Sequence, residues 1–424
     1  MVGVGFLLRL IFVFLNYKAL PNSAHFERFG AEMGWTARSL ALGRGFSSPF
    51  YPVTGPTALV PPFFPLVLAG VFKLFGVYSQ ASAFVALTLN SLLSALTSVV
   101  IFFGLRRRFG YPIARLGAWL WALFPYAIYY SAVYLWDCAL TSLLLASCFF
   151  IAWNHLPHAR SFVWAAWGLL AGMAALSNPS VFSLLPLFLA YAAWQRCRMR
   201  RPFAGRTLLS IATLCAALAP WCVRNLRVMH EPVFIRDGFW GEFYAGNSGD
   251  TSHSNPGWTH PASNATELRT YEQLGEAGYM ARKRSLSLLH IKADPEAFAL
   301  VSARRVLRFW TGYWSFSQGY LQDEALDLPN VPFCTLLALL TVIGLVGLCK
   351  GAGIEASPVL AAVLLFPLPY YVTHASIDYR QPIEPILISL IALGLYRLRH
   401  KSRSCMHRHS MFTVHDLARD ALKR

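Results

Sequence analysis

Long apolar runs alternate with short polar segments along most of the chain. About 20 predominantly apolar residues suffice for a helix to cross a bilayer, and a helix satisfies its own backbone hydrogen bonds there. The pattern therefore predicts an all-α polytopic membrane protein with about ten transmembrane helices. The predicted spans are residues 2–16, 81–105, 116–130, 139–153, 162–176, 181–194, 208–223, 332–349, 356–371 and 382–396.

Two longer polar segments interrupt this alternation. The first outer loop, about residues 17–80, contains a proline-rich apolar stretch, 61–75, which we expect to lie as a helix at the membrane interface. The second, residues 224–330, is predicted to form an outer subdomain. Asp294 and Pro295 are typical of a helix start, a cap followed by a first-turn proline.

These segments divide the chain into four predicted parts. They are a transmembrane catalytic module (1–223), the outer loop subdomain (224–330), the C-terminal transmembrane helices (331–397) and a basic tail (398–424).

Basic residues cluster at one end of the predicted spans. Arg106–Arg108, Arg196–Arg201 and the tail follow apolar runs. Positively charged segments stay in the cytoplasm, so both termini are expected inside and the two polar segments outside.

Composition agrees with a membrane protein. The chain is 56% hydrophobic and only 13% charged, about half the charged fraction of a soluble protein. A net charge of +17 raises nucleic acid as a partner. The basic clusters flank apolar runs, however, so the predicted partner is the lipid bilayer and no nucleic acid is expected.

Cysteine and histidine give little indication of a metal or redox site. The eight cysteines form no CxxC pair, lie outside the outer subdomain and are interpreted as packing residues or part of the tail. His253 and His260 lie in a polar loop without metal-ligand spacing. No metal ligand is predicted, and a divalent cation stays open as a cofactor.

Four polar clusters are predicted to share the outer face. Each alone is equally well explained as an interfacial anchor or a structural ion pair. Their convergence from distant parts of the chain indicates a site. They are Glu27 and Glu32 with Arg38; Asp137; Arg224 with Asn225; and Asp378, Tyr379 and Arg380 with Glu384.

The residue types in these clusters suit one kind of chemistry. A carboxylate can take a proton from a hydroxyl group, and arginine binds phosphate through paired hydrogen bonds. Together they favour a reaction with a lipid-anchored phosphate leaving group. The chain has no Walker loop and no zinc-protease helix motif in a credible context, so ATP hydrolysis and zinc proteolysis have no support.

Several motifs, in order, resemble the GT-C membrane glycosyltransferases, particularly the bacterial protein O-mannosyltransferase-like and aminoarabinose transferase-like enzymes. They are EMGWTARSLALGRGFSSPF, PPFFPLVLAGVFKLFG, APWCVRN, FYAGN, LGEAGYMARKR, DPEAFALVSARRVLRFW and YRQPIEPIL. The resemblance implies transfer of a hexose or pentose from a polyprenyl-phosphate donor to a periplasmic lipid, glycan or protein, at the bacterial inner membrane.

The resemblance also implies roles for individual residues. Glu32 stands where the family carries an acidic residue in the first outer loop, with Glu27 as the fallback, and Asp137 matches a second acidic position. The aminoarabinose transferases have a lysine where this chain has Val60. That departure weakens the transfer of their sugar specificity and phosphate contact to this chain.

The sequence thus leads to a mechanistic hypothesis. Glu32 removes or orients the proton of the acceptor hydroxyl, and the oxygen attacks the anomeric carbon, with inversion implied by the resemblance. Arg224 and Arg380 stabilise the leaving phosphate. The remaining substrate-binding candidates are Glu27, Arg38, Asn225, Asn247, Tyr379 and Glu384.

Two other function classes stay open. A transporter or flippase predicts polar residues at mid-span and broken helices in matched halves, whereas the polar residues here lie at the outer rim. The second alternative is a non-catalytic family member, which separation of Glu32, Asp137 and Arg380 in space would favour.

Overall fold

The computed structural model describes residues 1–21, 29–248, 259–312 and 327–399. Within these ranges all regular secondary structure is helical, and one isolated bridge joins Ser47 to Pro56. The predicted all-α membrane fold is confirmed. Five helical segments of the described residues are long and apolar enough to cross a membrane, and four shorter helices are apolar. The number of ten spans stays a prediction.

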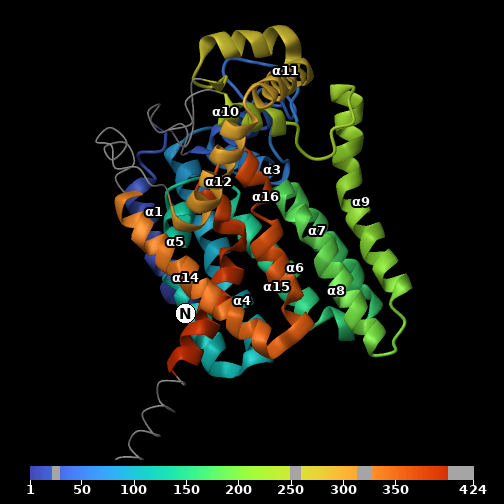
Figure 1. Cartoon of the computed structure of the whole chain (residues 1–424). Coiled ribbons are helices and arrows are strands. Elements are labelled where there is room, and N and C mark those ends of the chain that lie inside the picture. The colour runs from blue at the N-terminus through green and yellow to red at the C-terminus, as the bar shows by residue number, and fades with distance from the viewer. Residues whose placement is uncertain (22–28, 249–258, 313–326, 400–424) are drawn as a thin grey trace, which may run out of the picture.

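A bundle of apolar helices forms the body of the molecule (Figure 1). Its elements are α1 (Val2–Asn16), α4 (Gln80–Ala122), α5 (Pro125–Ala132), α6 (Cys138–Asn154), α7 (Ser161–Ser177), α8 (Leu185–Arg198), α9 (Ala204–Met229), α14 (Asp327–Ala352), α15 (Ser357–Leu365), α16 (Leu368–Val372) and the helix over 384–399. Short 3-10 turns cover Leu156–His158, Pro179–Ser183, Gly353–Ala356 and Asp378–Ile383.

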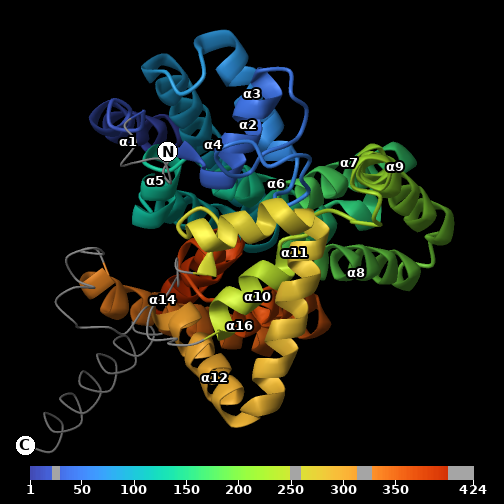
Figure 2. The ribbon, with the colours of Figure 1, turned by 90° about the horizontal axis from the view of Figure 1, so that it is seen from above.

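The remaining helices gather at one end of the bundle. They are α2 (Ala31–Ala41), α3 (Phe63–Phe75), α10 (Phe239–Asn247), α11 (Ala265–Ala293) and α12 (Pro295–Thr311). Figures 1 and 2 show α10 and α11 lying across this end. We call it the loop end, and we call the opposite end, which carries Arg106–Arg108 and Arg196–Arg201, the arginine end.

Helix α4 contains the predicted span 81–105 and the first part of the predicted span 116–130 in one hairpin. Gly110 has φ 79°, a left-handed conformation that glycine adopts at low cost. The chain reverses there, and Gly117 packs back against Leu105. The predicted span 116–130 is interrupted before Pro125, because proline cannot donate a backbone hydrogen bond inside a helix.

Arg9 ties α1 to the end of α4. This buried side chain donates to Oγ of Ser94 (3.1 Å) and to the carbonyl oxygen of Ala122 (2.9 Å). The last carbonyls of a helix have no partner within the helix. Arg9, a charged residue inside the apolar helix α1, therefore donates to a carbonyl oxygen at the end of α4 that has no partner within its own helix.

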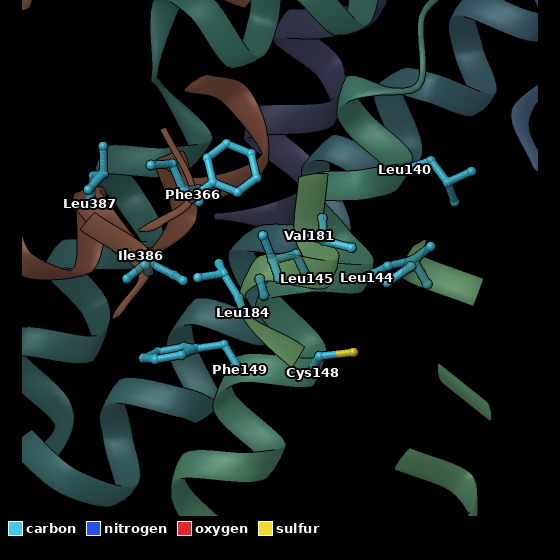
Figure 3. Packing of buried hydrophobic residues seen from close by; sticks show 14 of the residues in the cluster. Leu140, Leu144, Leu145, Cys148, Phe149, Val181, Leu184, Phe366, Ile386 and Leu387 are labelled. Atoms are coloured by element: carbon cyan, nitrogen blue, oxygen red, sulfur yellow. The ribbon is translucent and has the colours of Figure 1, made fainter. Parts of the chain in front are cut away.

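The core is centred on α6. Figure 3 shows Leu145, Cys148 and Phe149 of α6 beside Leu184, while Phe366 and Ile386 approach from the C-terminal helices. Cys148 is fully buried in this apolar contact, as expected for a packing cysteine.

The two polar segments are joined through Glu276 of α11. Its carboxylate accepts hydrogen bonds from the hydroxyl of Thr57, the amide of Ala58 (2.6 Å) and the hydroxyl of Tyr271 (2.7 Å). The hydroxyl of Thr57 in turn accepts from the amide of Leu59 (2.9 Å), so its proton points to Glu276. The helix α11 thereby fixes the first outer loop.

We expect Glu276→Gln to loosen this contact. Three donors face the carboxylate. In glutamine one carboxylate oxygen becomes an NH₂ group, so at least one of these donors would face another donor and lose its acceptor. A buried donor without a partner costs about 1–3 kcal/mol. Thermal unfolding of the purified protein should show the loss, and Glu272→Gln on the exposed side of α11 serves as the control. Equal stability of the two variants would contradict the expectation.

Candidate functional site

Arg236 lies at the centre of the polar groups at the loop end. It follows α9 and precedes α10, and its Nε donates to the carbonyl oxygen of Leu59 (2.8 Å). Its Nη2 pairs with Oε1 of Glu242 at 2.6 Å, while 34% of the arginine side chain remains exposed. Burial raises the pKa of Asp137, and the charge of Arg236 opposes that rise. Arg236 is thus a partly exposed cation at the loop end.

Glu242 links Arg236 to a second group of side chains. Nε2 of His374 lies 3.7 Å from Oε2 of Glu242 and 2.6 Å from the hydroxyl of Tyr379. Burial lowers the pKa of His374 below its usual value, which favours the neutral ring at pH 7. Partial burial opposes ionisation of Glu242, yet the positive groups around it lower its pKa. Of these groups we assign the main effect to Arg236, because His374 is neutral.

Glu32 lies in the first turn of α2 and contacts His260. Oε1 of Glu32 is 3.3 Å from Nε2 of His260, and the two side chains are 25% and 31% exposed. The amide of Ala262 donates to Nδ1 of His260 (3.2 Å). In the neutral ring Nδ1 is then the acceptor and Nε2 carries the proton. His260 therefore presents a donor to the carboxylate and orients it.

Asp137 precedes α6 and is held more tightly. Its Oδ2 accepts from the hydroxyl of Thr141 (3.0 Å) and from the amide of Asn178 (3.1 Å). Burial raises the pKa of Asp137 although both hydrogen bonds oppose the change. Of the two acidic residues, Glu32 is thus the more exposed to solvent and Asp137 the more buried.

Arg380 occupies the interior of the bundle. It forms a buried ion pair with Glu384, one helical turn further on, and donates to the carbonyl oxygens of Phe309 and Trp310 (3.1 Å each). Its donors are engaged with the protein itself. The ion pair and these hydrogen bonds of Arg380 involve neither Glu32 nor Asp137.

Arg224 and Asn225 lie within α9, which continues to Met229. Arg224 donates to the carbonyl oxygens of Phe46 (2.5 Å) and Thr57 (2.6 Å). Asn225 is buried and donates to the carbonyl oxygen of Val233. Both side chains hold loops in place.

The other predicted residues are distributed around the site. Asn247 accepts from Arg305 (3.0 Å) and donates to the carbonyl oxygen of Val372 (2.9 Å). The guanidinium of Arg38 lies over the ring of Trp35. Glu27 and His253 lie outside the described residues. Among the residues that are described, no three His, Cys, Asp or Glu side chains are grouped so that they could hold a metal ion.

Sequence reasoning missed Arg236, Glu242 and His374. Arg236 and Glu242 stand in the stretch IRDGFWGE, six positions apart, just before FYAGN. His374 stands five positions before Tyr379. The position of Arg236 just before the FYAGN motif was a signal that the sequence offered. A loop has no periodicity, however, so the sequence does not show which of its residues faces a site.

Part of the membrane region matches a known family. Residues 59–222 match the dolichyl-phosphate-mannose-protein mannosyltransferase family. This match covers less than half of the chain and agrees with the resemblance to the GT-C membrane glycosyltransferases. No curated protein matches the chain.

The chain has remote similarity to solved structures of membrane enzymes. The apo oligosaccharyltransferase of Archaeoglobus fulgidus has a TM-score of 0.48 and 13% identity, over 97% of this chain and 51% of that chain. The AglB complex from the same organism with an inhibitory peptide and a dolichol-phosphate gives 0.44 and 12%, over 91% and 48%. ArnT from Cupriavidus metallidurans gives 0.34 and 15%, over 86% and 72%. The chain thus spans about half the length of the oligosaccharyltransferase.

Proposed function

We propose that this chain transfers a hexose or pentose from a polyprenyl-phosphate donor to an acceptor on the periplasmic side of the bacterial inner membrane. The observation that supports the proposal is that two oppositely charged side chains at the loop end, the carboxylate of Glu32 and the guanidinium of Arg236, are both partly exposed. The positive-inside rule places the arginine end in the cytoplasm and the loop end outside. The match over residues 59–222 agrees with this class of enzyme.

In the proposed reaction Glu32 is the general base. The acceptor hydroxyl gives its proton to the carboxylate as its oxygen forms a bond to the anomeric carbon of the sugar. The bond from that carbon to the phosphate oxygen breaks, and its electron pair leaves with the polyprenyl phosphate. The attack inverts the anomeric centre. His260, whose Nε2 lies 3.3 Å from Oε1 of Glu32, positions the carboxylate.

Arg236 takes the role of phosphate ligand in this proposal. It replaces Arg380, which is almost fully buried in its pair with Glu384, and Arg224, which holds two carbonyl oxygens of the first outer loop. Arg236 also pairs with Glu242 and donates to Leu59, but its side chain remains 34% exposed. A fixed cation stabilises the charge that develops on a leaving phosphate. Asp137 remains the second acidic residue, held by Thr141 and Asn178 on the same side of the bundle.

Each of the four predicted parts of the chain has a role in this proposal. The module 1–223 supplies Glu32 and Asp137, and the subdomain 224–330 supplies Arg236, Glu242 and His260. The helices 331–397 add Tyr379 and His374, and 398–424 form the proposed cytoplasmic tail.

Radiolabel transfer in membranes tests the function. Polyprenyl-phosphate sugars are supplied to membranes that contain the wild-type chain, and label in periplasmic lipid, glycan and protein is counted. Label that moves to an acceptor supports a transferase. Label that crosses the membrane while still attached to its lipid would support a flippase instead.

We expect Arg236→Gln to impair donor use. A charge-assisted hydrogen bond contributes about 1.5–3 kcal/mol, so transfer at limiting donor should fall roughly 10- to 100-fold. The dependence on acceptor concentration should change less. Arg269→Gln, which removes an exposed charge from α11, is the control. A loss confined to acceptor use would contradict the assignment.

A further inference from the structure

A polar pocket opens at the arginine end, on the side of the bundle opposite to the proposed active site. It has a volume of about 220 Å³. Typical pockets for small molecules measure roughly 300–1,000 Å³, so this one suits a small group. The pocket is lined by Arg107, Arg108, Trp153, Asn154, Pro157, His158, Gln195 and Glu355.

Arg108 forms the fixed wall of the pocket. It pairs with Glu355 (2.5 Å) and donates to Asn154 (2.8 Å) and to the hydroxyl of Tyr191 (3.1 Å). Its guanidinium lies 4.2 Å from the ring centre of Trp153. Arg108 thus joins α4, α6, α8 and the turn before α15, and the charge of Glu355 is already matched.

Arg107 is the side chain available to a ligand. It is exposed, and its Nη1 lies 3.1 Å from Nδ1 of His155. Among the described residues, no carboxylate forms an ion pair with it. His158 stands at the same pocket. Burial, and then the charge of Arg107, lower the pKa of His155, which favours the neutral ring that can accept from Arg107. Arg107 therefore keeps its positive charge at the pocket, where an anion would be attracted.

We propose that this pocket binds a phosphate group through Arg107 and His158. An arginine offers paired N–H donors with the geometry of phosphate oxygens, and the imidazole of His158 can add another. The phosphate comes either from the headgroup of a phospholipid in the adjacent leaflet or from a soluble phosphate ester. The site is separate from the proposed sugar-transfer site and does not depend on it.

The test compares two adjacent arginines in the full-length protein. Arg107→Gln removes the pocket cation. Arg106→Gln removes an equal charge from a residue that stacks on Phe102 and does not line the pocket. Both side chains are exposed, so both variants should fold. Each variant removes one positive charge, so the general attraction of anions to the arginine end is the same in both.

Two probes distinguish the sources of phosphate. Inorganic phosphate is titrated into protein in a neutral detergent, and thermal unfolding is followed at constant ionic strength. Phosphatidylglycerol is added to phosphatidylcholine nanodiscs, and bound lipid is counted by native mass spectrometry.

We expect Arg107→Gln to weaken binding of at least one probe about tenfold and Arg106→Gln to change it less than twofold. Binding of lipid alone assigns the site to a headgroup, and binding of inorganic phosphate assigns it to a soluble ester. Equal effects of the two substitutions, or binding of neither probe, would overturn the proposal.

Discussion

Glu32→Gln is expected to reduce sugar transfer by roughly 10²- to 10⁴-fold, the usual contribution of a general base. Glutamine keeps the size of the side chain and one oxygen, so it can still face Nε2 of His260, which lies 3.3 Å from Oε1 of Glu32. It cannot take a proton from the acceptor hydroxyl. Since Glu32 is 25% exposed and is not part of the packed core, folding should be unaffected.

The measurement is the initial rate of label transfer at saturating donor and acceptor. Glu272→Gln is the matched control, because it makes the same exchange at an exposed position of α11. Thermal unfolding of all three proteins separates a catalytic loss from a structural one. Normal turnover by Glu32→Gln would remove the base assignment, and an equal loss in Glu272→Gln would point to a general effect on the loop end.

The result also bears on the non-catalytic alternative. Glu32 and Arg236 are both partly exposed at the loop end, where a substrate could reach them. Arg380, by contrast, lies in a buried pair. If neither wild type nor variant transfers label from any donor, the arrangement at Arg236 is structural and the scaffold interpretation gains.

Local signals in the sequence led to correct elements. Asp294 caps α12 as predicted, accepting from the amide of Ala297 (2.9 Å), and Pro295 occupies the first turn. Both depend only on neighbouring residues. The apolar runs likewise predicted the bundle, because the bilayer imposes helices on any apolar segment of sufficient length.

Contacts between distant residues could not be predicted in the same way. Arg224 and Arg380 have the right type and position for phosphate ligands, yet one binds the carbonyl oxygens of the first outer loop and the other binds Glu384. Which partner an arginine takes depends on tertiary packing. Arg236 lies in a loop without periodicity, and only the fold brings it to the carbonyl oxygen of Leu59 in the first outer loop.

Arg380→Met is expected to destabilise the protein by about 3–5 kcal/mol, because it leaves the carboxylate of Glu384 buried without its cation. Both side chains are almost fully buried. The carbonyl oxygens of Phe309 and Trp310 lose a donor as well, so the end of α12 should loosen from the bundle. Thermal unfolding of the purified chain measures the loss.

The double variant Arg380→Met/Glu384→Leu tests the cause. Replacing Glu384 by leucine removes the unpaired buried carboxylate and should restore part of the stability, since a well-packed apolar pair can replace a buried ion pair. A phosphate ligand would behave differently. Arg380→Met would then keep its unfolding temperature and lose donor use, and the double variant would recover nothing. For a structural ion pair we therefore expect the wild type to be the most stable, the double variant intermediate and Arg380→Met the least stable. This order would distinguish an ion pair from a substrate contact at Arg380, which the sequence alone had assigned to the active site.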